Sequence, residues 1–222
     1  VAVGWMVYEA SKHTGWNAKE VSSKILQCGR IRFQFPSLQW GASSDDGTSH
    51  ISWCNTAVLV TMLLGLLVYS IQVTQVPFAV HGDEGEVALT GLEIRDSGDW
   101  NLFKLAWYNI PALFYLIPSW TMWLFGDSLL GARVQGILFG VLSIPMMYLV
   151  ARRLFQPAPA ALASFLLAGS TFMMHFSRIG IGYNQATLVI LVGMYCLIRG
   201  AQQGQARWFV FAGIVAALGF LS

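Results

Sequence analysis

Several carboxylates gather in one short stretch of this chain, directly after a long apolar run. Of the eleven acidic residues in the sequence, this stretch holds six: Asp83, Glu84, Glu86, Glu93, Asp96 and Asp99. A carboxylate beside lipid hydrocarbon loses much of its hydration, so it must be paired or have a functional role. The adjacent pair Asp83-Glu84 is therefore the first candidate site. A carboxylate in such a place can take a proton from a hydroxyl or amine acceptor.

The composition indicates that this stretch belongs to a polytopic membrane protein. Hydrophobic residues make up 55% of the 222 residues, charged residues only 11%, and the mean hydropathy is +0.57. Soluble domains are usually about 25% charged. A net charge of +2 is too small to indicate a nucleic-acid partner. The three cysteines, Cys28, Cys54 and Cys196, are scattered and predict neither a disulfide framework nor a metal site.

Six apolar segments must position the acidic stretch. The first, residues 51–77, is long enough to cross a membrane and precedes an acidic loop at 78–108. Residues 109–125 follow, rich in Trp and Tyr and interrupted by Pro111 and Pro118. The later apolar runs are residues 131–150, 158–176, 183–198 and 208–221.

The basic residues predict how these segments cross the membrane. Lys and Arg gather in cytoplasmic connections. If residues 109–125 lie in the outer interface, then Arg152, Arg153, Arg199 and Arg207 all fall on the cytoplasmic side with the basic N-terminal tail. Their aromatic, proline-interrupted sequence also suits an interfacial helix. The sequence therefore predicts an all-α membrane helix bundle of about five spans, with an interfacial helix in the first external loop, residues 78–130.

Residues 1–50 are mixed and polar, and we expect a cytoplasmic tail before the bundle at 51–222. The chain begins with Val1 and stops at Ser222 in an apolar run, so we expect it to be part of a longer protein. We expect an integral protein of a bacterial cytoplasmic membrane, with its N-terminus in the cytoplasm.

One arginine falls on the predicted outer face near the acidic loop. Arg178 lies in the short connection 177–184 and is the only basic residue at a span end on that side. A guanidinium can grip a phosphate through two parallel hydrogen bonds. Glycines at positions 65, 136, 140 and 193 are expected to allow helices to approach closely.

These features, in this order, resemble the GT-C glycosyltransferases that use polyprenyl phosphates, in the ArnT-like, protein mannosyltransferase-like and RgtA/B/C/D-like group. The pair Asp83-Glu84 opens the first external loop, and a Pro- and Tyr-containing stretch at 109–118 follows it. The remaining matches are Phe125-Gly-Asp-Ser128, Ala132-Arg133, the segment 148–155 and Met174-His-Phe-Ser-Arg-Ile-Gly180. The resemblance covers about residues 55–222.

The resemblance implies a membrane glycosyltransferase that moves a hexosyl or pentosyl group from a polyprenyl-phosphate donor to an acceptor on the outer face. It implies that Asp83 is the catalytic base and that Glu84 supports the acceptor or orients Asp83. Arg178 would contact the lipid phosphate, and Tyr108 and Asn184 would bind substrate. The expected partners are membrane lipid and the sugar donor, together with other membrane subunits.

The chain departs from that group in two places. Ile110-Pro111 replaces a Pro-Pro pair, and Tyr183-Asn184 stands where many relatives carry an acidic residue. The resemblance allows a divalent metal between the external loops, but the sequence identifies no second carboxylate there. The alternative function is a non-catalytic subunit with the same scaffold in a larger membrane complex that carries pigments or electrons. A transporter is a distant third alternative, because no internal repeat is visible in the sequence.

Overall fold

The computed structural model describes residues 47–98, 101, 103–106 and 109–220. Every regular element within these residues is a helix, which confirms the all-α prediction. Residues 1–46 of the predicted tail and the predicted substrate contact Tyr108 lie outside the described residues.

Three helices are long and apolar enough to cross a membrane: α3 (Gly47–Ser70), α6 (Leu129–Ala151) and α9 (Tyr183–Gln203). They have 24, 23 and 21 residues, which at 1.5 Å per residue matches a hydrocarbon core about 30 Å thick. Two further apolar helices are shorter: α7 (Pro157–Ala168) and α10 (Ala206–Phe220). The chain is therefore an integral membrane protein, and the count of about five spans stays a prediction.

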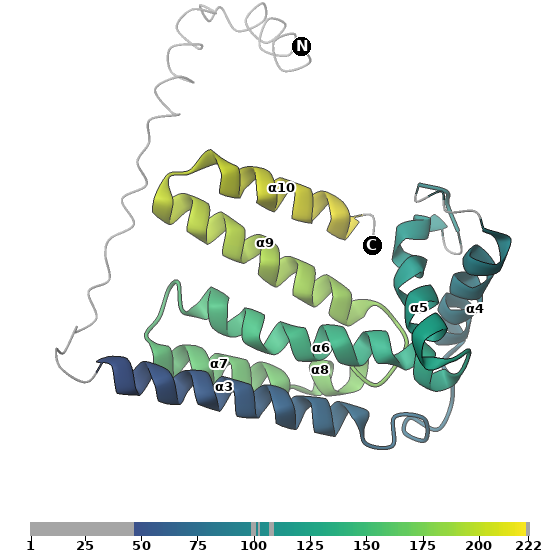
Figure 1. Cartoon of the computed structure of the whole chain (residues 1–222), viewed down its shortest axis with the longest axis horizontal. Coiled ribbons are helices and arrows are strands. Elements are labelled where there is room, and N and C mark those ends of the chain that lie inside the picture. Colours follow the sequence, from purple (N-terminus) through teal and green to yellow (C-terminus); the bar gives the residue numbers. More distant parts are fainter. Residues whose placement is uncertain (1–46, 99–100, 102, 107–108, 221–222) are drawn as a thin grey trace, which may run out of the picture. The chain divides into compact units, whose positions relative to one another are not determined.

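The long helices lie side by side, with α6 at the centre (Figure 1). It packs against α3, α7 and α9, and α9 in turn packs against α10. More than half of the residues of α6 are buried. Gly65 of α3 makes close packing possible, because a Cβ there would lie 2.7 Å from the Ile144 side chain of α6. A Cβ on Gly136 would lie 2.7 Å from the carbonyl oxygen of Ile179, in the turn before α9. The prediction of close helix approach is thus confirmed at Gly65.

Two helices, α4 (Gly82–Ser97) and α5 (Ala112–Phe125), form a pair at one end of the bundle (Figure 1). They pack on each other through a buried apolar cluster that includes Val87, Ile94 and Tyr115. The predicted segment 109–125 thus forms a helix of 14 residues, short of the ~20 that a span requires. Its place in the outer interface stays a prediction.

Two predicted boundaries were wrong. The first apolar run was expected to be helical to residue 77, but α3 ends at Ser70 and residues 71–80 form turns. The run 158–176 was expected to be one span, but it divides into α7 and the short α8 (Thr171–Phe176). The division occurs where the Ser170 hydroxyl accepts a hydrogen bond from the Met173 N–H and so begins a new helix.

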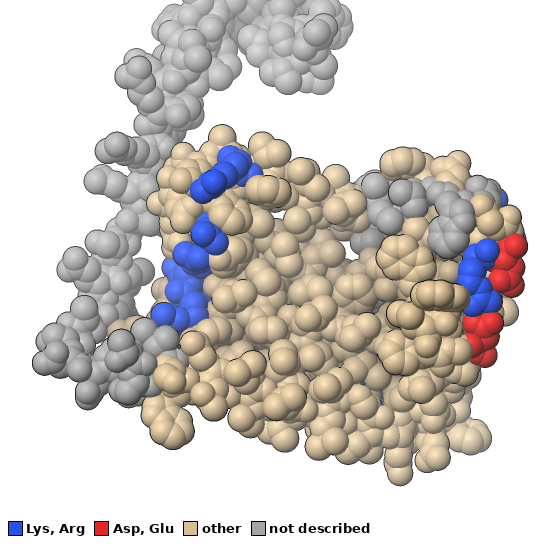
Figure 2. Space-filling model, viewed as in Figure 1, with Lys and Arg blue, Asp and Glu red and all other residues tan. Residues whose placement is uncertain are grey.

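Charged side chains separate to the two ends of the bundle. Figure 2 shows basic residues along the edge where α6 and α9 end and α10 begins. We call this edge the arginine end; its basic residues are Arg152, Arg153, Arg199 and Arg207. Acidic residues gather at the opposite edge, over α4 and α5, beside further basic ones (Figure 2). We call this edge the α4 end.

Candidate functional site

The candidate carboxylates lie in the first turn of α4. The imidazole Nδ1 of His81 accepts a hydrogen bond of 3.3 Å from the Asp83 N–H and caps the helix. Four N–H groups at the start of a helix have no acceptor within it, and the helix dipole is positive there. Asp83 and Glu84 therefore stand where a negative charge is favourable, which is a physical reason for α4 to begin at this point.

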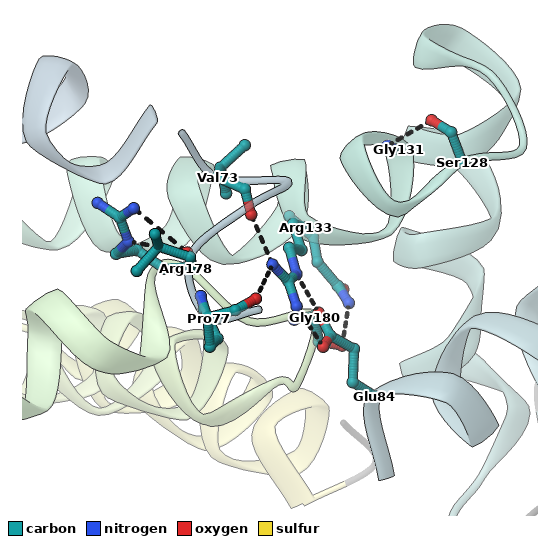
Figure 3. Close-up of polar contacts among 10 residues, drawn as sticks. Val73, Pro77, Glu84, Ser128, Gly131, Arg133, Arg178 and Gly180 are labelled. Atoms are coloured by element: carbon teal, nitrogen blue, oxygen red, sulfur yellow. Dashed lines mark hydrogen bonds and ion pairs between the residues drawn. The ribbon is translucent and has the colours of Figure 1, made fainter. Parts of the chain in front are cut away.

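Glu84 is buried and forms an ion pair with Arg133 of α6 (Figure 3). One carboxylate oxygen accepts a hydrogen bond from the Arg133 Nε at 2.6 Å, and the other accepts one from Nη2 at 2.9 Å. Both side chains are almost fully buried. The first oxygen also accepts from the Gly180 N–H at 2.7 Å. Two parallel charge-assisted bonds of this kind orient both partners firmly.

Arg133 extends the same network to the end of α3. Its Nη1 donates to the carbonyl oxygens of Val73, at 2.5 Å, and Pro77, at 3.2 Å. Next to it on α6, Gln135 donates to the carbonyl of Gly180 at 2.9 Å. The network thus joins the turn after α3, the start of α4, the start of α6 and the turn before α9. In the sequence, Arg133 stood out only as part of the Ala132-Arg133 match, and its pairing with Glu84 was not predicted.

Asp83 has a different environment from its neighbour. Successive residues of a helix point about 100° apart, so Glu84 faces the bundle while Asp83 does not. The Asp83 side chain is 49% exposed, and within the described part of the chain no Lys or Arg pairs with it; its carboxylate lies 3.7 Å from the His81 Nδ1. This leaves an accessible carboxylate on a helix that a buried ion pair holds in place.

Arg178 lies close to the same network, but its guanidinium donates hydrogen bonds to backbone carbonyls and not to a carboxylate. Its Nη1 donates to the carbonyl of Val68 at 2.7 Å, and its Nη2 to that of Ile71 at 2.6 Å. Nε and Nη2 also donate to the carbonyl of Val76. The carbonyls at the end of a helix lack partners and carry partial negative charge. Arg178 therefore caps α3, a role that the sequence did not reveal.

Asn184 is buried at the start of α9, behind the turn that carries Arg178. Its amide Nδ2 donates to the Ser177 hydroxyl at 2.7 Å and to the Gly136 carbonyl at 3.4 Å. Its Oδ1 is buried without a hydrogen-bond partner in the described residues. The structure thus places Glu84, Arg178 and Asn184 around one turn, with Asn184 enclosed beneath it.

A second ion pair joins the far end of α4 to the loop between α5 and α6. Arg95 donates from Nη1 and Nη2 to the two oxygens of Asp127, at 2.7 and 2.9 Å, and from Nε to Asp96. The pairing with Arg95 lowers the pKa of Asp127 below its ordinary value of 3.8. The two carboxylates raise the pKa of Arg95. In α5, burial raises the pKa of Tyr115 to about 12.

Two further features bear on ligands. An apolar pocket of about 430 Å³ lies on α5, lined by Arg95, Ser119, Trp120, Trp123 and Leu124. It does not include Asp83. Across the described ranges, His, Cys, Asp and Glu side chains do not gather into a group of three that could hold a metal ion. A divalent metal stays a prediction.

Comparison with known proteins adds to this geometry. The family model for dolichyl-phosphate-mannose-protein mannosyltransferase matches residues 109–222. An undecaprenyl phosphate-alpha-4-amino-4-deoxy-L-arabinose arabinosyl transferase of Edwardsiella ictaluri is 27% identical over 63% of this chain and 27% of its own length. Its namesake in Pseudomonas aeruginosa UCBPP-PA14 is 25% identical over 66% of this chain and 29% of its own length.

A third relative of the same kind is similar over more of this chain than these two. The second such transferase of Pseudomonas fluorescens Pf-5 is 26% identical over 83% of this chain and 33% of its own length. The chain thus spans a third or less of the length of these three relatives. No solved structure matches. Because the family model covers just over half of the chain, this protein belongs to the dolichyl-phosphate-mannose-protein mannosyltransferase family, a group of GT-C glycosyltransferases.

Proposed function

We propose that this chain forms part of a membrane glycosyltransferase. The enzyme would transfer a sugar from a polyprenyl-phosphate donor to an acceptor on the outer face of the membrane. Family membership supports this reaction class, and the names of the relatives indicate a polyprenyl-phosphate sugar donor. The lipid tail of such a donor stays in hydrocarbon while its head reaches a polar site. These comparisons do not support the alternative of a non-catalytic subunit.

The accessible carboxylate of Asp83 carries the mechanistic part of the proposal. Asp83 would accept the proton of the acceptor hydroxyl or amine while the acceptor atom bonds to the anomeric carbon. In the same displacement the bond from that carbon to the phosphate oxygen breaks, and polyprenyl phosphate leaves with the electron pair. A carboxylate with half of its surface exposed, and with no guanidinium or ammonium group paired to it in the described residues, is available for this step.

The neighbouring residues would have supporting roles. Glu84 is enclosed and paired, so we assign it to positioning: it holds the start of α4, and Asp83 with it, against α6. Arg178 has a second N–H on Nη1 without an acceptor in the described residues, and this N–H could donate to the phosphate. Asn184 is fully buried, which favours a role in holding the turn over direct contact with substrate. Tyr108 remains a proposed substrate contact.

We further propose that the α4 end faces outward and the arginine end faces the cytoplasm. The arginines at 152, 153, 199 and 207 lie where α6 and α9 end and α10 begins, and Asp83 lies in the first turn of α4, at the other end of the bundle (Figure 1). Lys and Arg are enriched on the cytoplasmic side of membrane proteins. In this orientation the N-terminus of α3 is in the cytoplasm, and we propose the bacterial cytoplasmic membrane as the location of the protein.

Replacing Asp83 by Asn tests the proposed base. Loss of a general base lowers the rate by about 10²–10⁴-fold, so transfer from a polyprenyl-phosphate sugar in membranes should fall by that factor. The matched control is Glu86→Gln, an exposed carboxylate of the same helical turn, which should retain nearly the parent activity. If Asp83→Asn transfers sugar at the parent rate while the protein is present at equal amounts, Asp83 is not the base.

A further inference from the structure

The arginine end contains four arginines without a nearby carboxylate among the described residues. The described Asp and Glu residues all lie between positions 83 and 127, at the α4 end. Arg152 and Arg153 follow α6, Arg199 lies in the last turns of α9, and Arg207 opens α10. Cytoplasmic charge alone would account for arginines here, but not for the way their side chains are arranged.

Two of these arginines converge on one phenol. The hydroxyl oxygen of Tyr195 accepts from the Arg153 Nη2 at 2.7 Å and from the Arg199 Nη1 at 2.8 Å. The Arg153 guanidinium lies 5.0 Å from the centre of the Tyr195 ring, and that of Arg199 lies 4.2 Å from the centre of the Trp208 ring. Aromatic rings hold cations in this way, but they do not neutralise two positive charges brought together.

The cluster also has a buried donor without an acceptor. The Nε of Arg199 is enclosed and makes no hydrogen bond within the described residues. Buried donors in native proteins nearly always have a partner, so this N–H is available to an anion that reaches the guanidinium. Side-chain amides brace the same region: Gln202 donates to the Arg153 carbonyl at 2.7 Å, and Trp208 donates to the Gln203 side chain at 2.9 Å. The guanidiniums are therefore held ready for an anion.

We propose that Arg153 and Arg199, held in place by the rings of Tyr195 and Trp208, bind the phosphate of an anionic phospholipid headgroup. Guanidiniums match the geometry of phosphate oxygens and bind them through paired hydrogen bonds. The cluster lies where apolar helices α6 and α9 end, which is the depth of the headgroups, and tryptophan prefers that depth. Basic pockets between membrane helices on the cytoplasmic side bind such lipids. This site is distinct from the proposed catalytic end and does not depend on Asp83.

Lipid retention by the purified protein tests the site. The delipidated protein in a zwitterionic detergent is mixed with phosphatidylglycerol or phosphatidylcholine of the same acyl chains, and bound lipid is counted by native mass spectrometry over a concentration series. The parent should retain one phosphatidylglycerol in preference to phosphatidylcholine. The variant Arg199→Gln should bind phosphatidylglycerol at least ~10-fold more weakly, because it loses a charge-assisted contact. Equal binding of both lipids by the parent overturns the proposal.

Arg152→Gln is the matched control, because Arg152 contacts the Phe155 carbonyl and neither ring. It makes the same charge change at the same end and should alter affinity by no more than ~2-fold. An equal loss in both variants would show general attraction by charge and overturn a built site. Adding a large excess of inorganic phosphate should leave the lipid bound; displacement would assign the site to a free anion and refute the headgroup.

Tyr195→Phe keeps every charge and removes only the oxygen on which the two arginines converge. It should weaken phosphatidylglycerol binding several-fold, since the guanidiniums are no longer held together. The melting temperature in the same detergent checks that each variant is folded. If Arg199→Gln does not fold, Tyr195→Phe decides the question, and unchanged binding by this folded variant contradicts the proposed geometry.

Discussion

Replacing Glu84 by Gln should destabilise the protein strongly. Glu84 is 1% exposed and accepts three hydrogen bonds, two from Arg133 and one from the Gly180 N–H, all between 2.6 and 2.9 Å. Glutamine has nearly the same shape, but it leaves the Arg133 guanidinium, itself 0% exposed, as a buried charge without a counter-ion. Removing one partner of a buried ion pair costs about 3–5 kcal/mol. Total stabilities are only about 5–15 kcal/mol, so this loss is a large fraction of the whole.

The measurement is reversible unfolding by sodium dodecyl sulfate in dodecyl maltoside micelles, followed by tryptophan fluorescence and circular dichroism. The matched control is Glu86→Gln in the same turn of α4, where the side chain is exposed and the change should stay within about 0.5 kcal/mol. The free energy of unfolding should therefore separate the two variants by several kcal/mol.

A second change distinguishes the ion pair from a general effect of altering α4. Removing Arg133 as well, as Arg133→Met in the Glu84→Gln background, takes away the uncompensated charge. The double variant should therefore be more stable than the sum of the two single losses predicts, by at least about 1 kcal/mol. Additive losses, or a loss below about 1 kcal/mol for Glu84→Gln alone, would refute the view that this pair fastens α4 to the bundle.

Two other perturbations have defined outcomes. Because Arg95 lowers the pKa of Asp127, this pair adds stability that is present above the ordinary carboxyl pKa of 3.8 and lost as pH falls through the lowered value. Asp127→Asn should remove that acid dependence in unfolding curves measured from pH 5 downward, and an unchanged curve would contradict the pairing. Gly136→Ala places a Cβ 2.7 Å from the Ile179 carbonyl and should destabilise the protein by about 1–3 kcal/mol, measured by the same unfolding assay. Gly213→Ala in α10 meets nothing within 4 Å and gains helix propensity, so a loss of equal size there would show that packing around Gly136 is not the cause.

The positions of the long helices could be predicted well from the sequence, because helix formation there depends on the local run of apolar residues. Long apolar runs in a membrane must form helices, since only helices or closed barrels pair every backbone group internally. The predicted runs at 131–150 and 183–198 became α6 and α9 with small extensions. One wrong boundary, the division between α7 and α8, has a local cause in the Ser170 cap, whereas the end of α3 also depends on a distant residue. Residues 71–77 contain three polar residues and end in Pro77, and Arg178, more than 100 residues later, donates hydrogen bonds to the carbonyls of Ile71 and Val76.

The site was less predictable, because it depends on partners far apart in the chain. Arg133 stands 49 positions after Glu84, and only the folded bundle brings their side chains within 2.6 Å. One signal was present: an arginine within a predicted membrane helix needs a partner, and such a partner must be a carboxylate or a set of carbonyls. That reasoning, applied to Arg133, would have identified the acidic loop as its target, although it could not have chosen among six carboxylates.

The choice between Asp83 and Glu84 follows from helix geometry once that pair is known. Two carboxylates in succession on a helix point in different directions, so a helix end anchored through one of them presents the other to its surroundings. Glu84 is buried against Arg133 and the Gly180 N–H, so Asp83 must point elsewhere. Its side chain is indeed exposed. Glu84 alone is attached directly to α6, and its attachment also fixes the backbone position of Asp83. The adjacent acidic pair thus divides into one residue that holds the helix and one that is accessible, as the proposed base must be.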